Sequence, residues 1–455
     1  MGCTEDETIA SKVELKNHSV TPALVKGLPS GVRVFSLIGS DDQLFGSPNF
    51  VFGGSADGMG IWKNADGTFA LVVNHEDNFA VSRIKFDDTF KPVSGEYIVN
   101  SDKGQWRLCS ATLATPDEHG FGPTFLTCGE SGETSMTHAL DPNMTAGGNT
   151  TLLTALGQYS GENAMPLPKN AYLGKTVILT MDDDSGPGGG QVGMYVGNTG
   201  DLTGGSLYLM SRNDGKQTET DMKIGQDIAV TFKKVPDASV GGDVINSTVV
   251  NDLKAIKFGR VEDVDYRKGG NGREVYFNVT GQAWSGANAD SSRTKYGRVY
   301  KLILDPSDWT KGTLRCILDG DDRAGIAGKF QNPDGICVTN NYVYIEEDPN
   351  GYGDETHDAY IYQYTISTGQ MQVVMELDHK RGDAYYNVGG DSKFGSWEYG
   401  AMTDISDIIG IENTFALCIQ PHTWKGAKYK GVDGGAKRPN EEQASQIIIV
   451  KGLPR

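Results

Sequence analysis

Six short stretches of the chain carry carboxylates, and three of them have a histidine, cysteine or arginine beside the acid. They are "NHED" at 74–77, "LCSAT" with "LTCGE" between 108 and 130, "MDDD" at 181–184, "GRVED" at 259–263, "NPDG" with "YIEED" between 332 and 348, and "SWEYG" at 396–400. Carboxylates that close hydrophobic strands are costly to bury without a cation. Hard cations such as Ca²⁺ and Fe³⁺ prefer oxygen ligands. The joint pattern therefore predicts a metal-binding site.

Other kinds of site fit the spacing poorly. The seven histidines form no HxH or HExxH pattern, which disfavours a zinc hydrolase, and no stretch fits an EF-hand loop. No GxSxG motif marks a nucleophilic serine. Taken singly, each stretch also has a structural interpretation: "MDDDSG" and "EEDPNG" are typical of turns, and His75 is typical of a buried structural histidine. Cys109 and Cys128 could equally be buried thiols or a disulfide.

The elements that would position these residues are short strands. Apolar or alternating runs are separated by Gly, Asn, Asp and Pro clusters, the chain has 60 glycines, and helical periodicity is nearly absent. Several strands run directly into acidic residues: "LVVNHED", "FLTCGE", "VILTMDDD" and "VYIEED". This rhythm favours an all-β fold, a single β-propeller of about six blades at 20–455 with a metal cluster at its central channel. Residues 1–19 are predicted to be a flexible tail, and a pair of β-sandwiches is the alternative fold.

Charge and cysteine content limit the function further. The chain has 41 Lys and Arg against 59 Asp and Glu, a formal charge of −18, and no basic run, so we expect no nucleic-acid partner. Cys3, followed by a small acidic stretch, is typical of the mature end of a bacterial lipoprotein. We therefore expect either a periplasmic protein or a cell-surface lipoprotein that is anchored through a lipid on Cys3. We also expect the protein to be a monomer.

The order of these motifs resembles the PhoX-type alkaline phosphatases of bacteria over about residues 45–425. The most specific parts are "RVED" followed by "VYFNVT", and "NPDG" followed by "IEED". The resemblance implies a six-bladed propeller whose channel holds Fe³⁺, bound partly by a cysteine, together with Ca²⁺. It implies hydrolysis of small phosphate monoesters.

Carried over residue by residue, the resemblance implies a set of metal ligands: Glu76, Cys109, Glu130, Asp184, Glu262, Glu347, Asp348 and Glu398, with Cys128 as second choice for the cysteine. The chain departs from the family in three places. The segment "TPDEHGFGPT" is longer, Gly129 replaces the first glutamate of a pair, and the closing "QHPG" motif is present only as Gln420, Pro421 and His422.

Arg260 and Glu262 would share one face of an extended strand, so both would face the channel. A glutamate can bind a cation, while an arginine fork can bind phosphate oxygens that this acidic chain would otherwise repel. We expect Arg260 and Asn74 to bind the phosphate while a metal-activated oxygen attacks phosphorus. The alternative for Arg260 and Glu262 is a surface ion pair on an edge strand.

Two rival functions remain at this level. A calcium-dependent propeller lactonase or phosphotriesterase would hold calcium alone and give no role to a cysteine. A non-catalytic, calcium-stabilised binding propeller would hydrolyse no ester. The phosphatase interpretation makes two structural predictions of its own: Glu76 and Glu262 share one compact site, and Cys109 is reduced rather than bonded to Cys128.

Overall fold

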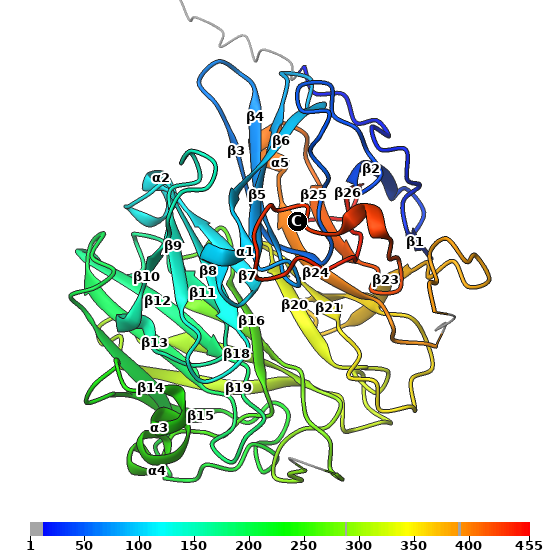
Figure 1. Cartoon of the computed structure of the whole chain (residues 1–455). Helices are drawn as coiled ribbons and strands as arrows, with labels where there is room; N and C mark the ends of the chain where they lie inside the picture. Colours follow the sequence, from blue (N-terminus) through cyan, green and yellow to red (C-terminus); the bar gives the residue numbers. More distant parts are fainter. Residues whose placement is uncertain (1–11, 287–288, 390–392) are drawn as a thin grey trace, which may run out of the picture.

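The computed structural model describes residues 12–286, 289–389 and 393–455, which form an all-β propeller. Each strand pairing in its sheets is antiparallel, and the sheets follow one another around a common centre (Figure 1). The prediction of a single all-β propeller is confirmed.

Four of the five sheets formed by the described residues are separate blades. The first blade contains β3 (Ala56–Lys63), β4 (Phe69–His75), β5 (Ala80–Phe86) and β6 (Pro92–Val99). The second contains β7 (Arg107–Ala114), β8 (Thr124–Glu130), β9 (Thr137–Leu140) and β10 (Thr151–Leu152). Another contains β20 (Pro333–Val338), β21 (Tyr342–Glu347), β22 (Tyr360–Thr365), β23 (Met371–Leu377) and β1 (Val25–Lys26). The last contains β24 (Glu398–Asp404), β25 (Thr414–Gln420), β26 (Gln446–Lys451) and β2 (Arg33–Gly39).

The fifth sheet has nine strands and occupies two positions of the ring. One half contains β11 (Gly161–Pro166), β12 (Lys175–Asp182), β13 (Val192–Asn198), β14 (Ser206–Arg212) and β15 (Ile228–Lys234). The other contains β16 (Val261–Tyr266), β17 (Glu274–Val279), β18 (Arg298–Leu304) and β19 (Lys311–Asp319). The two halves join where β15 pairs with β19, with Ile228 opposite Leu314. The blade count therefore differs from six separate blades, because two neighbouring blades share this outer edge.

Helices are short and lie in connections. They are α1 (Ser101–Gly104), α2 (Pro116–His119), α3 (Gly242–Val244), α4 (Val250–Leu253) and α5 (Ser406–Ile409), with the single turns η1 (Thr154–Leu156), η2 (Ile245–Val249) and η3 (Ala427–Tyr429). Among the described residues, no helix has the length and apolar character needed to cross a lipid bilayer.

Six inner strands close a ring around the centre. Each contacts the next in the order β3, β7, β11, β16, β20, β24 and back to β3. Strands from the two ends of the chain join in one blade and so close the ring. There β2 pairs with β26, and Val34 lies opposite Val450. Residues 12–19 of the predicted tail lie against this blade: Val13 and Leu15 pack on its apolar residues, and the Asn17 side chain accepts a hydrogen bond from the Ser36 amide.

Alternating apolar side chains hold the sheets against one another. In β12 the run "VILTM" is fully buried, and its Val177, Leu179 and Met181 belong to one apolar cluster with Phe258 and Val261 of the neighbouring ring position. Side chains on alternate positions of a strand point to opposite faces, so a strand buried on both faces is apolar throughout. The second and outer strands thus supply much of the apolar core, while inner strands also carry polar side chains such as Ser110, Asn163 and Asp263.

Candidate metal centre

Each inner strand carries a β-bulge near its N-terminal end. The pairing register shifts between Ala56 and Met59, Leu108 and Ala111, Gly161 and Ala164, Val261 and Val264, Pro333 and Ile336, and Tyr399 and Met402. A bulge interrupts the ladder and redirects a side chain, and bulges are common beside active sites. The first residue inside five of the six bulges is a potential metal ligand: Asp57, Cys109, Glu162, Glu262 and Asp334.

The sixth bulge follows a different local rule. Its first residue is Gly400, which has no side chain to bind a metal. The potential ligand of this strand is Glu398, two residues earlier. A Cβ atom on Gly400 would lie 2.4 Å from the Ala56 carbonyl oxygen and 2.8 Å from the Asp57 Cα atom. Glycine is therefore required where β24 passes close to β3, and the carboxylate is supplied from just before the bulge.

The second strand of a blade adds potential metal ligands at the same place. Antiparallel pairing puts its end beside the start of the inner strand: His75 lies opposite Ala56, Glu130 opposite Arg107, and Glu347 opposite Pro333. Glu76, Glu130 and Asp348 are therefore carried to the centre by the strands that run into acidic residues. This register is the physical basis of the pattern seen in the sequence.

Donor atoms from distant parts of the chain converge in three groups. Within each group the donor atoms all lie within 4.8 Å of one another, and the groups are Asp57, Glu76 and Cys109; Glu162, Glu262 and Asp334; and Asp334, Asp348 and Glu398. Asp334 joins the second group to the third. Glu130 links the first and second, because Cys109 Sγ lies 3.5 Å from its Oε2, and because its charge adds to burial and nearer charges in raising the pKa of Glu76 and of Glu262.

The three donor groups concentrate buried negative charge that cations would stabilise. Burial, followed by repulsion from neighbouring carboxylates, raises the pKa of a set of carboxyl groups well above the ordinary range: Asp57, Glu76, Glu162, Glu262, Asp334 and Glu398. Burial, with the charges of Glu162 and Glu76, also raises the pKa of the Cys109 thiol. So many like charges are stable together only when protonated or bound to metal ions. Carboxylates with one thiolate fit hard cations and iron.

Arg260 anchors one side of this centre. It precedes β16 with φ of 68°, a backbone conformation that is uncommon for a side chain of this size. Its Nε and Nη2 donate to the Asp183 carboxylate at 2.7 and 2.9 Å, Nη1 donates to Asn350 Oδ1 at 2.6 Å, and Nη2 lies 3.3 Å from Glu262 Oε1. The guanidinium is therefore fixed beside the second group of donors. The alternative of a surface ion pair does not fit an arginine side chain that is only 24% exposed.

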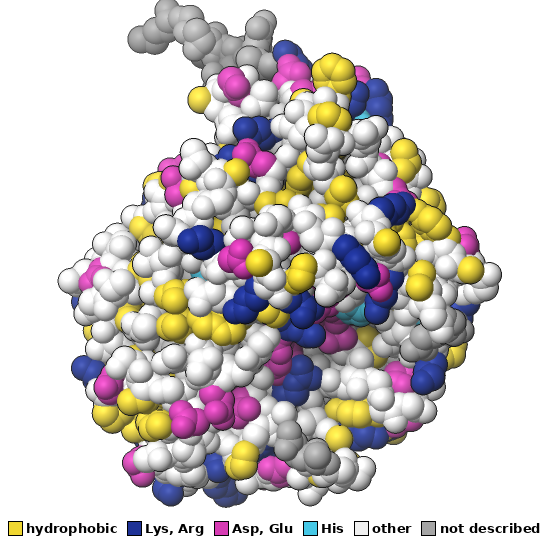
Figure 2. Space-filling view, viewed as in Figure 1, with side chains coloured by type: hydrophobic (Ala, Val, Ile, Leu, Met, Phe, Trp, Pro, Cys, Tyr) yellow, Lys and Arg dark blue, Asp and Glu magenta, His cyan; other side chains and the backbone are white. Residues whose placement is uncertain are grey.

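A second arginine lies beside the first donor group. Arg107 Nη1 is 3.2 Å from Glu76 Oε1, and its Nη2 is 3.2 Å from Asp77 Oδ1. Glu130 interacts with both Arg107 and Arg260. At the middle of the face shown in Figure 2, Asp and Glu side chains lie in a hollow that is bordered by Lys and Arg.

Three predicted site residues lie elsewhere or act differently. Asn74 is fully buried and its amide donates to the Cys109 carbonyl, so in this structure it positions the β7 bulge. Asp184 is outside the three groups, and its carboxylate accepts the Gly186 amide at 3.1 Å, as in a turn.

Glu347 is the clearest correction to the predicted ligand set. Its carboxylate accepts the amides of Gln331 and Tyr360 and the Tyr362 hydroxyl at 2.7 to 2.9 Å, and His357 Nε2 lies 3.0 Å away. All of its acceptor positions are directed into the blade. In the run "EED", the neighbour Asp348 is the residue that reaches the centre.

Sequence reasoning did not single out Asp57 or Glu162. It placed Asp183 and Asp334 in acidic stretches but did not assign them as ligands. A common pattern surrounds Asp57, Glu162 and Asp334. The signal that they share is local: "ADG", "GEN" and "PDG" each place an acid before a small or amide residue at the start of a strand, where a bulge forms. Cys109 and Cys128 are both free, as predicted, and Cys128 Sγ lies 3.4 Å from the Thr137 hydroxyl rather than in a donor group.

Comparison with known proteins supports the fold. No protein-family model and no curated protein sequence matches the chain. Among solved structures, "Pseudomonas fluorescens PhoX in complex with vanadate, a transition state analogue" matches with a TM-score of 0.63 and 14% identity, over 96% of this chain and 98% of that chain. The expected resemblance to PhoX-type proteins is thus confirmed at the level of the fold.

Two further matches are more distant. An α-L-arabinofuranosidase from Fusarium graminearum matches with a TM-score of 0.43 and 11% identity, over 91% of this chain and 97% of that chain. A PQQ-bound aldose sugar dehydrogenase from Streptomyces coelicolor matches with a TM-score of 0.37 and 12% identity, over 93% and 100% of the two chains. Neither similarity bears on the function of this chain.

Proposed function

We propose that the chain is a metal-dependent phosphatase that hydrolyses small phosphate monoesters, with Fe³⁺ and Ca²⁺ bound at the propeller centre. One observation carries the proposal: all six inner strands bring a carboxylate or thiol to one place, directly beside a fixed arginine. The fold likeness to PhoX, whose structure contains the transition-state analogue vanadate, supports the choice of phosphate chemistry.

The donor types suggest how the metals would be divided. The group of Asp57, Glu76 and Cys109 includes a sulfur donor, which suits iron far better than calcium. The groups that share Asp334 contain only oxygen donors, which suit calcium. When bound, these cations would neutralise charge on the phosphate and lower the pKa of a water molecule.

Arg260 is the residue proposed to hold the phosphoryl group. A guanidinium has five N–H donors, and three are in use, two to Asp183 and one to Asn350. Of the two remaining donors, one is on Nη1 and one is on Nη2, and Nη2 also lies 3.3 Å from Glu262 Oε1. With a cation bound to Glu262, these two donors would form a fork of the kind that binds two phosphate oxygens. Asp183, whose side chain is only 5% exposed, holds this fork in place. Because the donors are already oriented, they can stabilise charge that develops on the phosphoryl oxygens.

The test is hydrolysis by protein loaded with iron and calcium. We expect release of phosphate from p-nitrophenyl phosphate, loss of the activity after chelation, and recovery only when both metals are returned. Glu262→Gln should bind less metal and lose the activity. Hydrolysis of a lactone or a phosphotriester without any monoester hydrolysis would instead favour the calcium-dependent alternative, and no hydrolysis of any ester would favour the binding propeller.

We also propose that the protein works in the periplasm or at the cell surface as a monomer. Cys3, the predicted lipid-anchor residue, lies outside the described residues. Fractionation of cells that express the full chain, with and without Cys3→Ala, tests the anchor: the parent should be found with membranes, and the variant should be released.

A further inference from the structure

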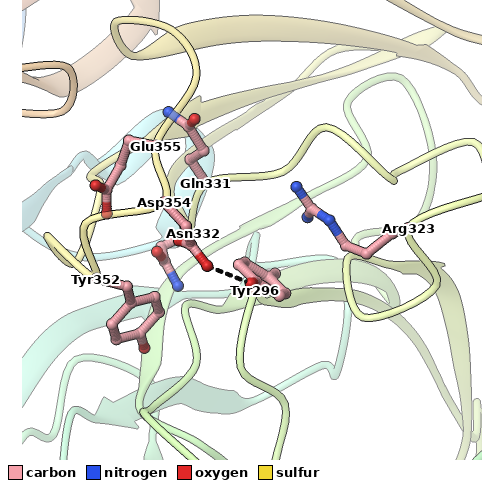
Figure 3. Close-up of a pocket in the computed structure, with 7 residues that line it drawn as sticks. All are labelled: Tyr296, Arg323, Gln331, Asn332, Tyr352, Asp354 and Glu355. Atoms are coloured by element: carbon pink, nitrogen blue, oxygen red, sulfur yellow. Dashed lines mark hydrogen bonds between the residues drawn. The ribbon is translucent and has the colours of Figure 1, made fainter.

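A small polar pocket lies next to Arg260. It has a volume of about 230 Å³ and is lined by Tyr296, Arg323, Gln331, Asn332, Tyr352, Asp354 and Glu355. Figure 3 shows Arg323 on one side of the open space, and Glu355 and Tyr352 on the other. The volume is below the roughly 300–1,000 Å³ of sites for drug-sized ligands, so it suits one small ring or a short chain.

Two asparagines connect the pocket to the metal centre. Arg260 donates to Asn350, and the Asn350 amide donates to Asn332 Oδ1 at 3.2 Å. Asn332 is 1% exposed, donates to the carbonyls of Thr280 and Lys295 at 2.8 and 2.9 Å, and stands two residues before Asp334. The pocket is therefore connected to Arg260 through Asn332, which lines it, and Asn350, which contacts both residues.

The polar character of the pocket excludes an alkyl group. None of the residues that line it is aliphatic. The charges nearly cancel, because the acids Asp354 and Glu355 are balanced by Arg323 and by Lys295, whose Nζ lies 3.0 Å from Asp354 Oδ2. A neutral ligand with many hydrogen-bonding groups is the best match to such a surface.

The Tyr352 hydroxyl also favours a ligand with many hydrogen-bonding groups. It is buried and lies close to the Asn332 and Asn350 side chains, but it forms no hydrogen bond of good geometry with any described residue, although most buried polar atoms have one. Arg323 offers further donors as well, since within the described part of the chain its hydrogen bonds all come from Nη1, which donates to the Gly320 and Phe330 carbonyls.

The tyrosine rings are already covered, which disfavours a flat base. The Arg323 guanidinium lies 4.1 Å from the centre of the Tyr296 ring, and Lys295 Nζ lies 4.3 Å from it and 5.0 Å from the Tyr352 ring. The two rings meet edge to face at 6.3 Å. Stacking of a nucleobase needs an open ring face, whereas hydroxyl groups need the donors and acceptors that remain.

We propose that this pocket binds the alcohol part of the substrate, and that this alcohol is a sugar or another polyol. The inference rests on the proposed phosphatase function. With the phosphoryl group held between the metal centre and Arg260, the esterified alcohol extends past Asn350 into the pocket. Its hydroxyl groups then pair with Tyr352, Arg323 and the two acids.

The test compares Tyr352→Phe with a matched tyrosine outside the pocket, Tyr342→Phe, at the start of β21. The measured quantity is the ratio of kcat/KM for glucose 6-phosphate to kcat/KM for methyl phosphate, whose alcohol is too short to reach the pocket. One net hydrogen bond is worth about 1 kcal/mol, so Tyr352→Phe should lower this ratio about five-fold. Tyr342→Phe should leave it unchanged. A ratio that is the same in both variants and the parent, or a parent that prefers AMP to glucose 6-phosphate, would overturn the proposal.

A binding measurement separates this inference from the proposed function. Saturation-transfer NMR detects contact of free glucose with the protein without any hydrolysis. If the parent hydrolyses no phosphate ester but binds glucose, and Tyr352→Phe abolishes that binding, the phosphatase proposal fails and the pocket assignment stands. If phosphate esters are hydrolysed but glucose does not bind, the pocket assignment fails alone.

Discussion

Replacement of Arg260 should separate phosphate binding from metal binding. The guanidinium is no metal ligand, but Asp183 and Asn350 hold it in place, with its second Nη2 donor beside Glu262 and its second Nη1 donor unused by these partners. A preoriented donor of this kind contributes about 2.7–4 kcal/mol to a transition state, a factor of roughly 10²–10³ in kcat. Arg260→Ala should therefore keep its iron and calcium and lose that factor. Arg260→Lys should recover little of it, because an ammonium group cannot form the two-pronged contact.

The same substitution should lower the stability of the metal-free protein. Asp183 and Glu262 side chains are each only 5% exposed, and Arg260 is their shared cationic partner. Loss of one member of a buried ion pair typically costs about 3–5 kcal/mol. In the metal-loaded protein part of this cost should disappear, since cations beside Glu262 replace the lost charge. The difference in melting temperature between parent and variant should thus be larger after chelation than before.

The assay measures metal content, kcat for p-nitrophenyl phosphate and melting temperature on the same preparations. Arg315→Ala serves as the control, because this arginine also forms a two-pronged contact with an aspartate, Asp227, but on the exposed surface. It should retain the parental rate. An Arg260→Ala protein that hydrolyses the ester at the parental rate would refute the assignment, and one that has lost its metals would show that the arginine supports the metal centre instead.

Three further predictions follow from particular residues. Cys109→Ser should lose iron but keep most of its calcium and its fold, as measured by elemental analysis and circular dichroism; unchanged iron would contradict the thiolate assignment. Gly400→Ala should destabilise the protein by about 1–3 kcal/mol and reduce bound metal, because its Cβ would overlap the Ala56 carbonyl, whereas Gly270→Ala in an exposed turn should do neither. Burial raises the pKa of Glu219 from 4.5 to about 7, so the folded state holds its proton more tightly and the free energy of unfolding should fall as pH rises across that interval. Glu219→Gln should make this pH dependence shallower, and an unchanged slope in denaturant titrations would contradict the shift.

The sequence indicated the fold because the strands are short, apolar and separated by turn residues. It also indicated candidate ligands at the ends of second strands, since Glu76, Glu130 and Asp348 each follow an apolar run that a sequence pattern can detect. It did not reveal that two neighbouring blades join through β15 and β19, because such an edge contact depends on how the sheets lie in space.

Several candidate ligands on the inner strands were harder to foresee. Asp57, Glu162 and Asp334 stand at the start of a strand inside a bulge, where no apolar run precedes them. Strand alternation alone assigns a side chain to a face only while the register is regular, and a bulge changes that register. For the same reason the run "EED" could not separate Glu347, which faces the blade interior, from Asp348, which reaches the centre.

The central claim is that the propeller centre holds iron and calcium together. The most direct measurement is elemental analysis of the purified chain, produced with both metals available and then dialysed. The account predicts that iron and calcium both remain bound in fixed ratios to protein, and that both fall in Glu262→Gln. Calcium alone, or neither metal, would contradict it.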